Sequence, residues 1–167
     1  DTGDGAAFVF KSIIDPFIGQ FAFFRVLTGV IKSNSDIINL NNGTKEHIGQ
    51  ILMLNGKNQT PLDEATPGCI CAVAKLKATK TGDTIATSAK CHAMPPMDFP
   101  NPVMFHAISA VKSGEEDKIM TALAKICEGD PTLRLKRNTE THELLLCGMG
   151  DLHLANAVKH LKENAKV

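Results

Sequence analysis

The feature that most restricts the fold is a phenylalanine-rich stretch near the N-terminus, residues 8–31. It contains six of the chain's eight phenylalanines, and the chain has no tryptophan or tyrosine. Bulky apolar side chains alternate along residues 8–13 and 21–31, with Asp15-Pro16 and Gly19 between them. Alternation around turn residues predicts a β-hairpin. One hairpin cannot bury this much aromatic surface, so later strands must cover it.

Further short strands follow at regular spacing as far as about residue 89, with no helical period. Asn41-Asn42-Gly43 and Asn55-Gly56 predict tight turns between strands. The strands expected after the hairpin are residues 37–40, 44–54, 70–76 and 84–87. Six or seven short strands in this arrangement predict a small closed or nearly closed β-barrel, which we assign to residues 1–93.

A proline-rich segment, residues 94–102, separates the predicted barrel from the rest of the chain. It contains four of the eight prolines. Proline fixes φ and removes a hydrogen-bond donor, so this segment is interpreted as a semi-rigid linker. The chain is therefore expected to be multi-domain, first all-β and then α+β.

Residues 103–167 have the order β-α-β-β-α. The expected elements are a strand at 103–111, a helix that a Ser113–Glu116 capping box opens and Gly129 ends, strands around 133–136 and 143–147, and a helix that Asp151 caps. This order predicts a ferredoxin-like sandwich that lacks its last strand. The first strand would then lie at an unpaired edge, so we expect this domain to be less stable than the barrel or to borrow a strand from a neighbouring molecule.

The bulk composition excludes some classes of protein. Lys plus Arg equal Asp plus Glu at 18 each, so no overall field attracts nucleic acid or membrane. No apolar run is long enough to cross a bilayer. Five cysteines, an odd number, fit reduced thiols in the cytosol better than a disulfide framework. Because the chain begins at Asp1 without a methionine, we expect it to be part of a longer protein.

No catalytic, cofactor or metal site is predicted within this chain. The Gly148-Met149-Gly150 sequence could cradle a phosphate, but it fits better as a tight turn from a strand into a helix. Cys147 and His160 are not accompanied by a CxxC pair or an HExxH motif, so a metal site is rejected. There is also no GxxxxGK[ST] motif for nucleotide hydrolysis.

Two groups of residues have alternative interpretations. His153, in the first turn of the last predicted helix, is either a neutral structural histidine or a residue at a domain contact. Lys32, Lys45, His47 and Lys57 fall at barrel turns and on the arm between them, where such barrels often contact nucleic acid. They could equally be ordinary solvated side chains.

The order of the motifs resembles the elongation factor G family of ribosomal translocation GTPases. The barrel half carries residues 10–12, 15–19, 24–26 and 29, then 47–49, 72–73, 75–76 and 81–84 (Thr-Gly-Asp-Thr). The second half carries residues 116–118, 123, 128, 130–132 (Asp-Pro-Thr) and 148–154 (Gly-Met-Gly-Asp-Leu-His-Leu). The two sets match the second and third domains of the family, in that order.

The resemblance implies a translation-factor-type β-barrel followed by the truncated sandwich. It implies that Lys32, Lys45 and Lys57 contact small-subunit ribosomal RNA, and that Asp130 and His153 face the GTPase domain and the fusidic acid pocket. GTP and Mg²⁺ would be bound by a GTPase domain of the parent protein, not by this chain, and the parent would work on the ribosome in the cytoplasm.

Other functions stay open from the sequence. Ribosomal protection proteins of the tetracycline-resistance type and the third release factor share this architecture. A free-standing barrel-plus-sandwich protein that binds RNA or a protein partner is the alternative of a different class.

Overall fold

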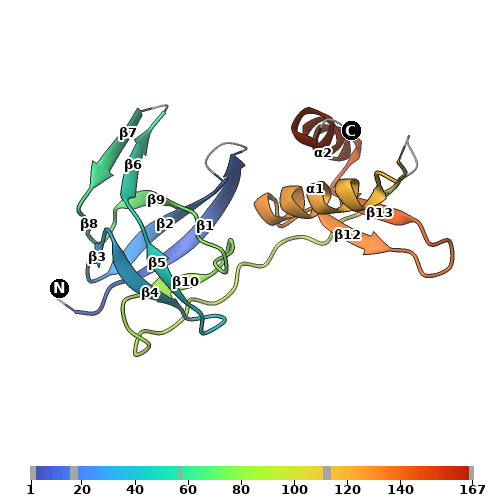
Figure 1. The fold of residues 1–167 in the computed structure, drawn as a ribbon. Coiled ribbons are helices and arrows are strands. Elements are labelled where there is room, and N and C mark those ends of the chain that lie inside the picture. The colour runs from blue at the N-terminus through green and yellow to red at the C-terminus, as the bar shows by residue number, and fades with distance from the viewer. Residues whose placement is uncertain (1–2, 16–18, 57, 111–113, 166–167) are drawn as a thin grey trace. The chain divides into compact units, whose positions relative to one another are not determined.

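The computed structural model describes residues 3–15, 19–56, 58–110 and 114–165. The chain divides into two compact units, Asp1–Met97 and Asp98–Val167, each with its own hydrophobic core (Figure 1). The division falls inside the proline-rich segment. The fold class is as predicted: a curled antiparallel β half-barrel precedes a small α+β unit with two helices.

The first unit is built around the predicted hairpin. β1 (Ala6–Asp15) pairs antiparallel with β2 (Gly19–Thr28). Along β2, Ala22, Phe24 and Val26 are fully buried because alternate side chains point into the core. The phenylalanines do not all enter it: Phe8 and Phe23 are only half-buried. The predicted turn residue Pro16 lies outside the described residues.

The other strands of this unit complete an eight-stranded sheet with the order β5-β4-β10-β1-β2-β9-β6-β7, and a small β3-β8 sheet. They are β3 (Ile31–Lys32), β4 (Ser35–Asn39), β5 (Lys45–Ile48), β6 (Ile51–Asn55), β7 (Asn58–Leu62), β8 (Glu64–Ala65), β9 (Ile70–Ala74) and β10 (Thr84–Ala86). The core includes Phe24, Ile31 and Ile85, all fully buried.

Two details of the predicted barrel are wrong. The single strand expected at 44–54 is two strands, β5 and β6, which Gly49-Gln50 separates. They lie at opposite ends of the strand order, since β5 pairs with β4 whereas β6 pairs with β7 and β9. Strand β7 was missed because its sequence is polar and contains Pro61, and β8 because it is only two residues long. A proline is tolerated there because β7 is an edge strand.

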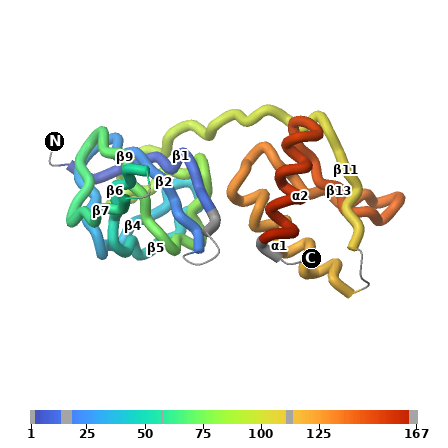
Figure 2. Tube along the Cα trace, turned by 90° about the horizontal axis from the view of Figure 1, so that it is seen from above, coloured from blue at the N-terminus to red at the C-terminus, as the bar shows by residue number. Residues whose placement is uncertain are grey.

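The second unit is a three-stranded antiparallel sheet with two helices on one face (Figure 2). Its elements are β11 (Met104–Ile108), α1 (Glu116–Gly129), β12 (Arg134–Arg137), β13 (Leu144–Gly148) and α2 (Asp151–Ala165), and the strand order is β11-β13-β12. Leu123, Leu146 and Leu154 are fully buried between sheet and helices. As predicted, β11 is an edge strand.

The helix starts differ from the sequence prediction. α1 begins at Glu116, and its N-cap residue, Glu115, makes no side-chain capping hydrogen bond. The Glu116 carboxylate instead accepts a hydrogen bond from the Gly114 N–H. Glu116 therefore cannot be the third residue of a capping box, and Ser113 lies outside the described residues. Asp151 is the first residue of α2 rather than its cap.

Candidate functional site

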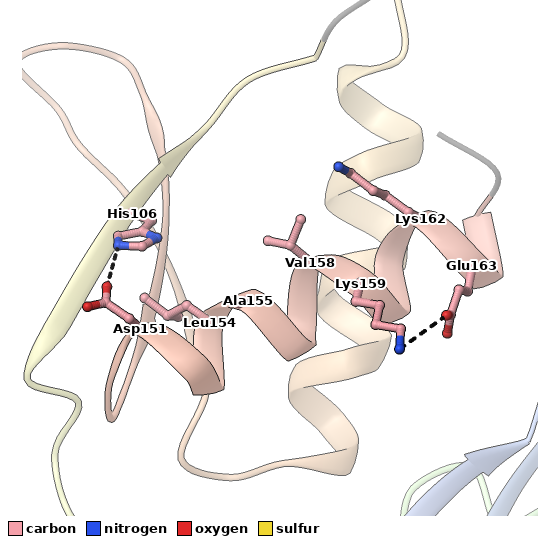
Figure 3. Close-up of a pocket in the computed structure, with 8 residues that line it drawn as sticks. All are labelled: His106, Asp151, Leu154, Ala155, Val158, Lys159, Lys162 and Glu163. Atoms are coloured by element: carbon pink, nitrogen blue, oxygen red, sulfur yellow. Dashed lines mark ion pairs between the residues drawn. The ribbon is translucent and has the colours of Figure 1, made fainter.

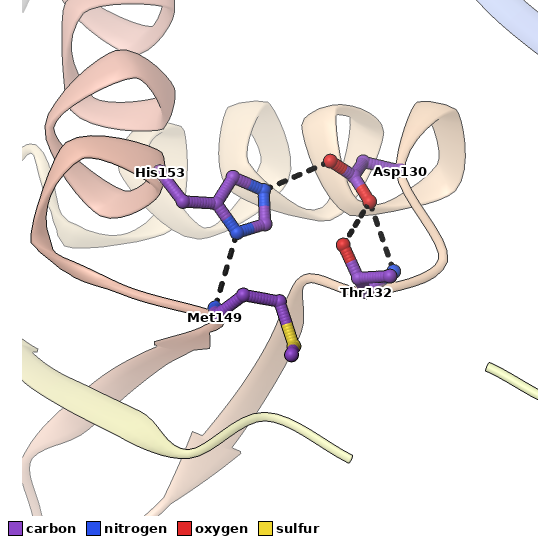
Figure 4. A network of polar contacts seen from close by, with 4 residues as sticks. All are labelled: Asp130, Thr132, Met149 and His153. Carbon is purple, nitrogen blue, oxygen red and sulfur yellow. Dashed lines mark hydrogen bonds and ion pairs between the residues drawn. The ribbon is translucent and has the colours of Figure 1, made fainter. Parts of the chain in front are cut away.

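A polar network joins the two loops at one end of the second unit (Figure 4). His153, in the first turn of α2, has its Nε2 2.9 Å from Oδ2 of Asp130, the residue that follows α1. Its Nδ1 accepts a hydrogen bond from the Met149 N–H at 3.1 Å. The tautomer that satisfies both contacts is neutral, with its proton on Nε2 donated to Asp130. Both ring nitrogens are therefore hydrogen-bonded, as the structural alternative expects, and a role at a domain contact stays a prediction.

Asp130 is held on its other oxygen by the turn that leads into β12. The Thr132 N–H and hydroxyl donate to Oδ1 at 2.9 and 2.5 Å. Burial alone would raise the pKa of Asp130, but the hydrogen bonds from Thr132 and His153 lower it more, so that the pKa lies below its usual value. The carboxylate is thus kept ionised while it links the end of α1 to the start of α2.

The turn between β13 and α2 leaves little room for a side chain at its first position. A Cβ on Gly148 would lie 2.7 Å from Cδ2 of Leu154 and 3.2 Å from Nδ1 of His153. Gly148-Met149-Gly150 is therefore the tight strand-to-helix turn that the sequence favoured, with a backbone that packs directly against the polar network.

We expect acid to weaken this network. The folded-state pKa of Asp130 is depressed, so the unfolded chain binds more protons, and the stabilisation is present above the unfolded pKa of about 4. It is lost as the pH falls through the lower, folded pKa. In urea unfolding followed by helical circular dichroism, the stability difference between Asp130→Asn and the unmodified chain should shrink as the pH falls below about 4. Asp98→Asn, at an exposed carboxylate, is the control; an Asp130→Asn effect that does not change with pH would contradict the assignment.

A hollow of about 560 Å³ lies between β11 and α2 (Figure 3). Leu154, Ala155 and Val158 supply its apolar wall. Ion pairs lie toward its two ends: His106–Asp151 at 3.3 Å and Lys159–Glu163 at 3.9 Å. The sequence does not indicate this hollow, because His106 is far in the sequence from the α2 residues that line it.

The two predicted RNA-contact lysines that the structure describes, Lys32 and Lys45, are on the surface of the first unit and lie on different strands. Lys32 is exposed on β3, opposite Glu64 of β8. Lys45 is exposed on the edge strand β5, opposite Ile38 of β4. Lys57 lies outside the described residues. An opposing carboxylate weakens the field of Lys32, so Lys45 is the better candidate of the two for a phosphate contact.

The described parts of the chain contain no cluster of three His, Cys, Asp or Glu side chains that could hold a metal ion. Neither of their two helices is long and apolar enough to cross a membrane. All five cysteines are free. Burial raises the pKa of Cys71 and of Cys127 to about 11, so these thiols are poor nucleophiles.

Comparison with known families matches both units in order. The family "Elongation factor G domain 2" matches residues 4–88, and "Elongation Factor G, domain III" matches residues 99–167. The chain belongs to the elongation factor G family. A crystal structure of a Thermus thermophilus protein is similar over 97% of the chain, with 32% sequence identity and a TM-score of 0.85.

Membership in the elongation factor G family identifies the two units as its second and third domains. They support a translation elongation factor as the parent protein. The match spans 24% of the Thermus protein. The residues of the Asp130–His153 network belong to the Asp-Pro-Thr and Gly-Met-Gly-Asp-Leu-His-Leu motifs on which the resemblance to the family is based.

Proposed function

We propose that this chain is the ribosome-binding and domain-coupling part of an elongation factor G family protein that acts in protein biosynthesis. One observation carries the proposal: the second and third domains of the family match consecutive parts of the chain and together cover nearly all of it. The parent protein would hydrolyse GTP with Mg²⁺ in a separate GTPase domain and work on cytoplasmic ribosomes.

The two units have different roles in this proposal. The first unit binds small-subunit ribosomal RNA, with Lys45, Lys32 and Lys57 as candidate phosphate contacts. The second unit receives the nucleotide state of the GTPase domain through the surface around Asp130 and His153, and the proline-rich segment acts as the hinge between the units. The polar network supports this role, because it connects the C-terminal end of α1 to the N-terminal end of α2, so that a domain touching this corner would act on both helices.

Binding to isolated small ribosomal subunits tests the first role. The chain should sediment with the subunits, and its affinity should fall as the salt concentration rises. Lys45→Ala should weaken binding and reduce the slope of log affinity against log salt by about 1. Lys11→Ala, at an exposed lysine of β1, is the matched control and should change neither quantity.

Two outcomes would count against the proposal. Absence of binding to small subunits at low salt would reject ribosome binding by this chain. Equal effects of Lys45→Ala and Lys11→Ala would reject Lys45 as a contact, because the loss would then follow net charge alone.

A further inference from the structure

The two faces of the β11-β13-β12 sheet differ sharply. One face packs against the helices: Leu146, Leu144 and Leu135 belong to the core that contains Leu123 and Leu154. Successive side chains of a strand point to opposite faces. The residues between these core positions therefore point to the other face, which neither α1 nor α2 covers.

The strand register places two rows of side chains on this uncovered face. The first row is Phe105, Cys147 and Arg134, and the second is Ala107, Leu145 and Lys136. Phe105 is 55% exposed, although a phenylalanine on a sheet face would normally be covered. Arg134 and Lys136 are exposed as well, whereas Cys147, on the central strand between Phe105 and Arg134, is buried. The face thus presents an aromatic ring on one edge strand and two cations on the other.

Its charge is of one sign. β11, β12 and β13 contain no Asp or Glu, whereas β12 places Arg134 and Lys136 on this face; its third cation, Arg137, pairs with Leu144 in the row that faces the helices. None of these cations takes part in the ion pairs found within the described segments. Burial raises the pKa of Cys147, and nearby Lys136 and Arg134 partly oppose it, which agrees with their place beside Cys147. In a chain of zero net charge, this is a local anion-attracting surface.

We propose that this uncovered sheet face binds single-stranded RNA, with a base stacked on Phe105 and backbone phosphates held by Arg134 and Lys136. Exposed aromatic rings on a flat sheet stack unpaired bases, and adjacent cations follow the backbone. Phe105 and Arg134 are two strands apart, roughly 10 Å, which neighbouring base and phosphate groups of an extended strand can bridge. An acidic protein partner would engage the cations but would not account for the exposed aromatic ring in the same row.

This site goes beyond the proposed function, which assigns RNA contacts to the first unit. It is independent of the ribosome, because the interaction requires only an unpaired stretch of RNA. The two proposals can be tested separately: Lys45→Ala should weaken binding through the first unit, and Phe105→Ala should weaken binding through the sheet face.

The test is a fluorescence-anisotropy titration of a fluorescein-labelled oligouridylate with the whole chain. Phe105→Ala should weaken binding about 5- to 150-fold, the loss of one stacked base. Arg134→Ala and Lys136→Ala should each lower the slope of log affinity against log salt by about 0.7. Leu152→Ala removes an apolar side chain that is 77% exposed on α2, and Lys125→Ala removes an exposed cation on α1; neither should alter binding.

Helical circular dichroism of every variant shows that the second unit is folded, so a loss of affinity is not a loss of structure. The proposal is overturned if the chain does not bind the oligouridylate at low salt, or if Phe105→Ala binds it as well as the unmodified chain. It is also overturned if Lys45→Ala abolishes binding while Phe105→Ala does not. Sedimentation that shows self-association lost in Phe105→Ala, with RNA binding unchanged, would identify a protein-contact face instead.

Discussion

Phe24→Ala should destabilise the first unit by about 3–5 kcal/mol and leave the second unit unchanged. Phe24 is fully buried at the centre of β2, where it packs in the half-barrel core. Truncation removes its transfer free energy and leaves a cavity that the surrounding strands cannot fill. The two units have separate cores, so the loss should not spread.

Hydrogen exchange followed by mass spectrometry separates the two units, because peptides from β2 and from α1 report on different cores. Protection should fall in β1, β2 and β9 and stay constant in α1 and α2. Phe23→Ala is the matched control. Phe23 directly precedes Phe24 and is only half-buried, so its truncation should lower the protection of the first unit clearly less. Equal loss of protection in both units would mean that they unfold as one cooperative body.

Gly148→Ala should cost about 1–3 kcal/mol of stability in the second unit, the usual range for overpacking a core. The new methyl group would overlap Leu154, which is fully buried and has little space to move, and would press on Nδ1 of His153. Urea unfolding followed by helical circular dichroism measures the loss, because both described helices lie in this unit.

Gly150→Ala is the control two residues away. A Cβ there meets no atom within 4 Å, and its backbone is not in the left-handed region, so the change should stay within about 0.5 kcal/mol. The ¹⁵N shift of His153 Nδ1 gives a second readout: it should move in Gly148→Ala, which disturbs the bond from the Met149 N–H, and not in Gly150→Ala. If both variants behave alike, close packing at Gly148 is not what the turn requires.

The sequence predicted the elements that have a strong local signal. The β1–β2 hairpin and α1 follow from apolar periodicity, and the β4–β5 turn follows from Asn41-Asn42-Gly43. It could not predict β7, whose polar residues and proline form a strand only because β6 offers a partner. The break at Gly49-Gln50 was also missed. Apolar residues on both sides of it resemble one continuous strand, and only the pairing shows that β5 and β6 have different neighbours.

The candidate sites divide in the same way. Asp130 and His153 were found through their motifs, but their 2.9 Å contact and the Met149 N–H that fixes the tautomer require the fold. The uncovered sheet face was not visible in the sequence at all. Phe105 and Arg134 are brought into one row only by the pairing of β11 and β12 with β13.

The two-residue link between β5 and β6 sets a limit on the shape of the first unit. In the strand order six steps separate these strands, which in a flat sheet would be roughly 29 Å. From Ile48 to Ile51 the backbone can reach only about 11 Å. The link is therefore too short for a flat sheet, and the sheet must curve to bring β5 and β6 together. Ser33 and Asn34 lie beside this link: the Ser33 hydroxyl accepts a hydrogen bond from the Ile51 N–H, and the Asn34 N–H donates to the Gly49 carbonyl. Curvature in this unit is thus imposed by the length of the backbone as well as by strand twist.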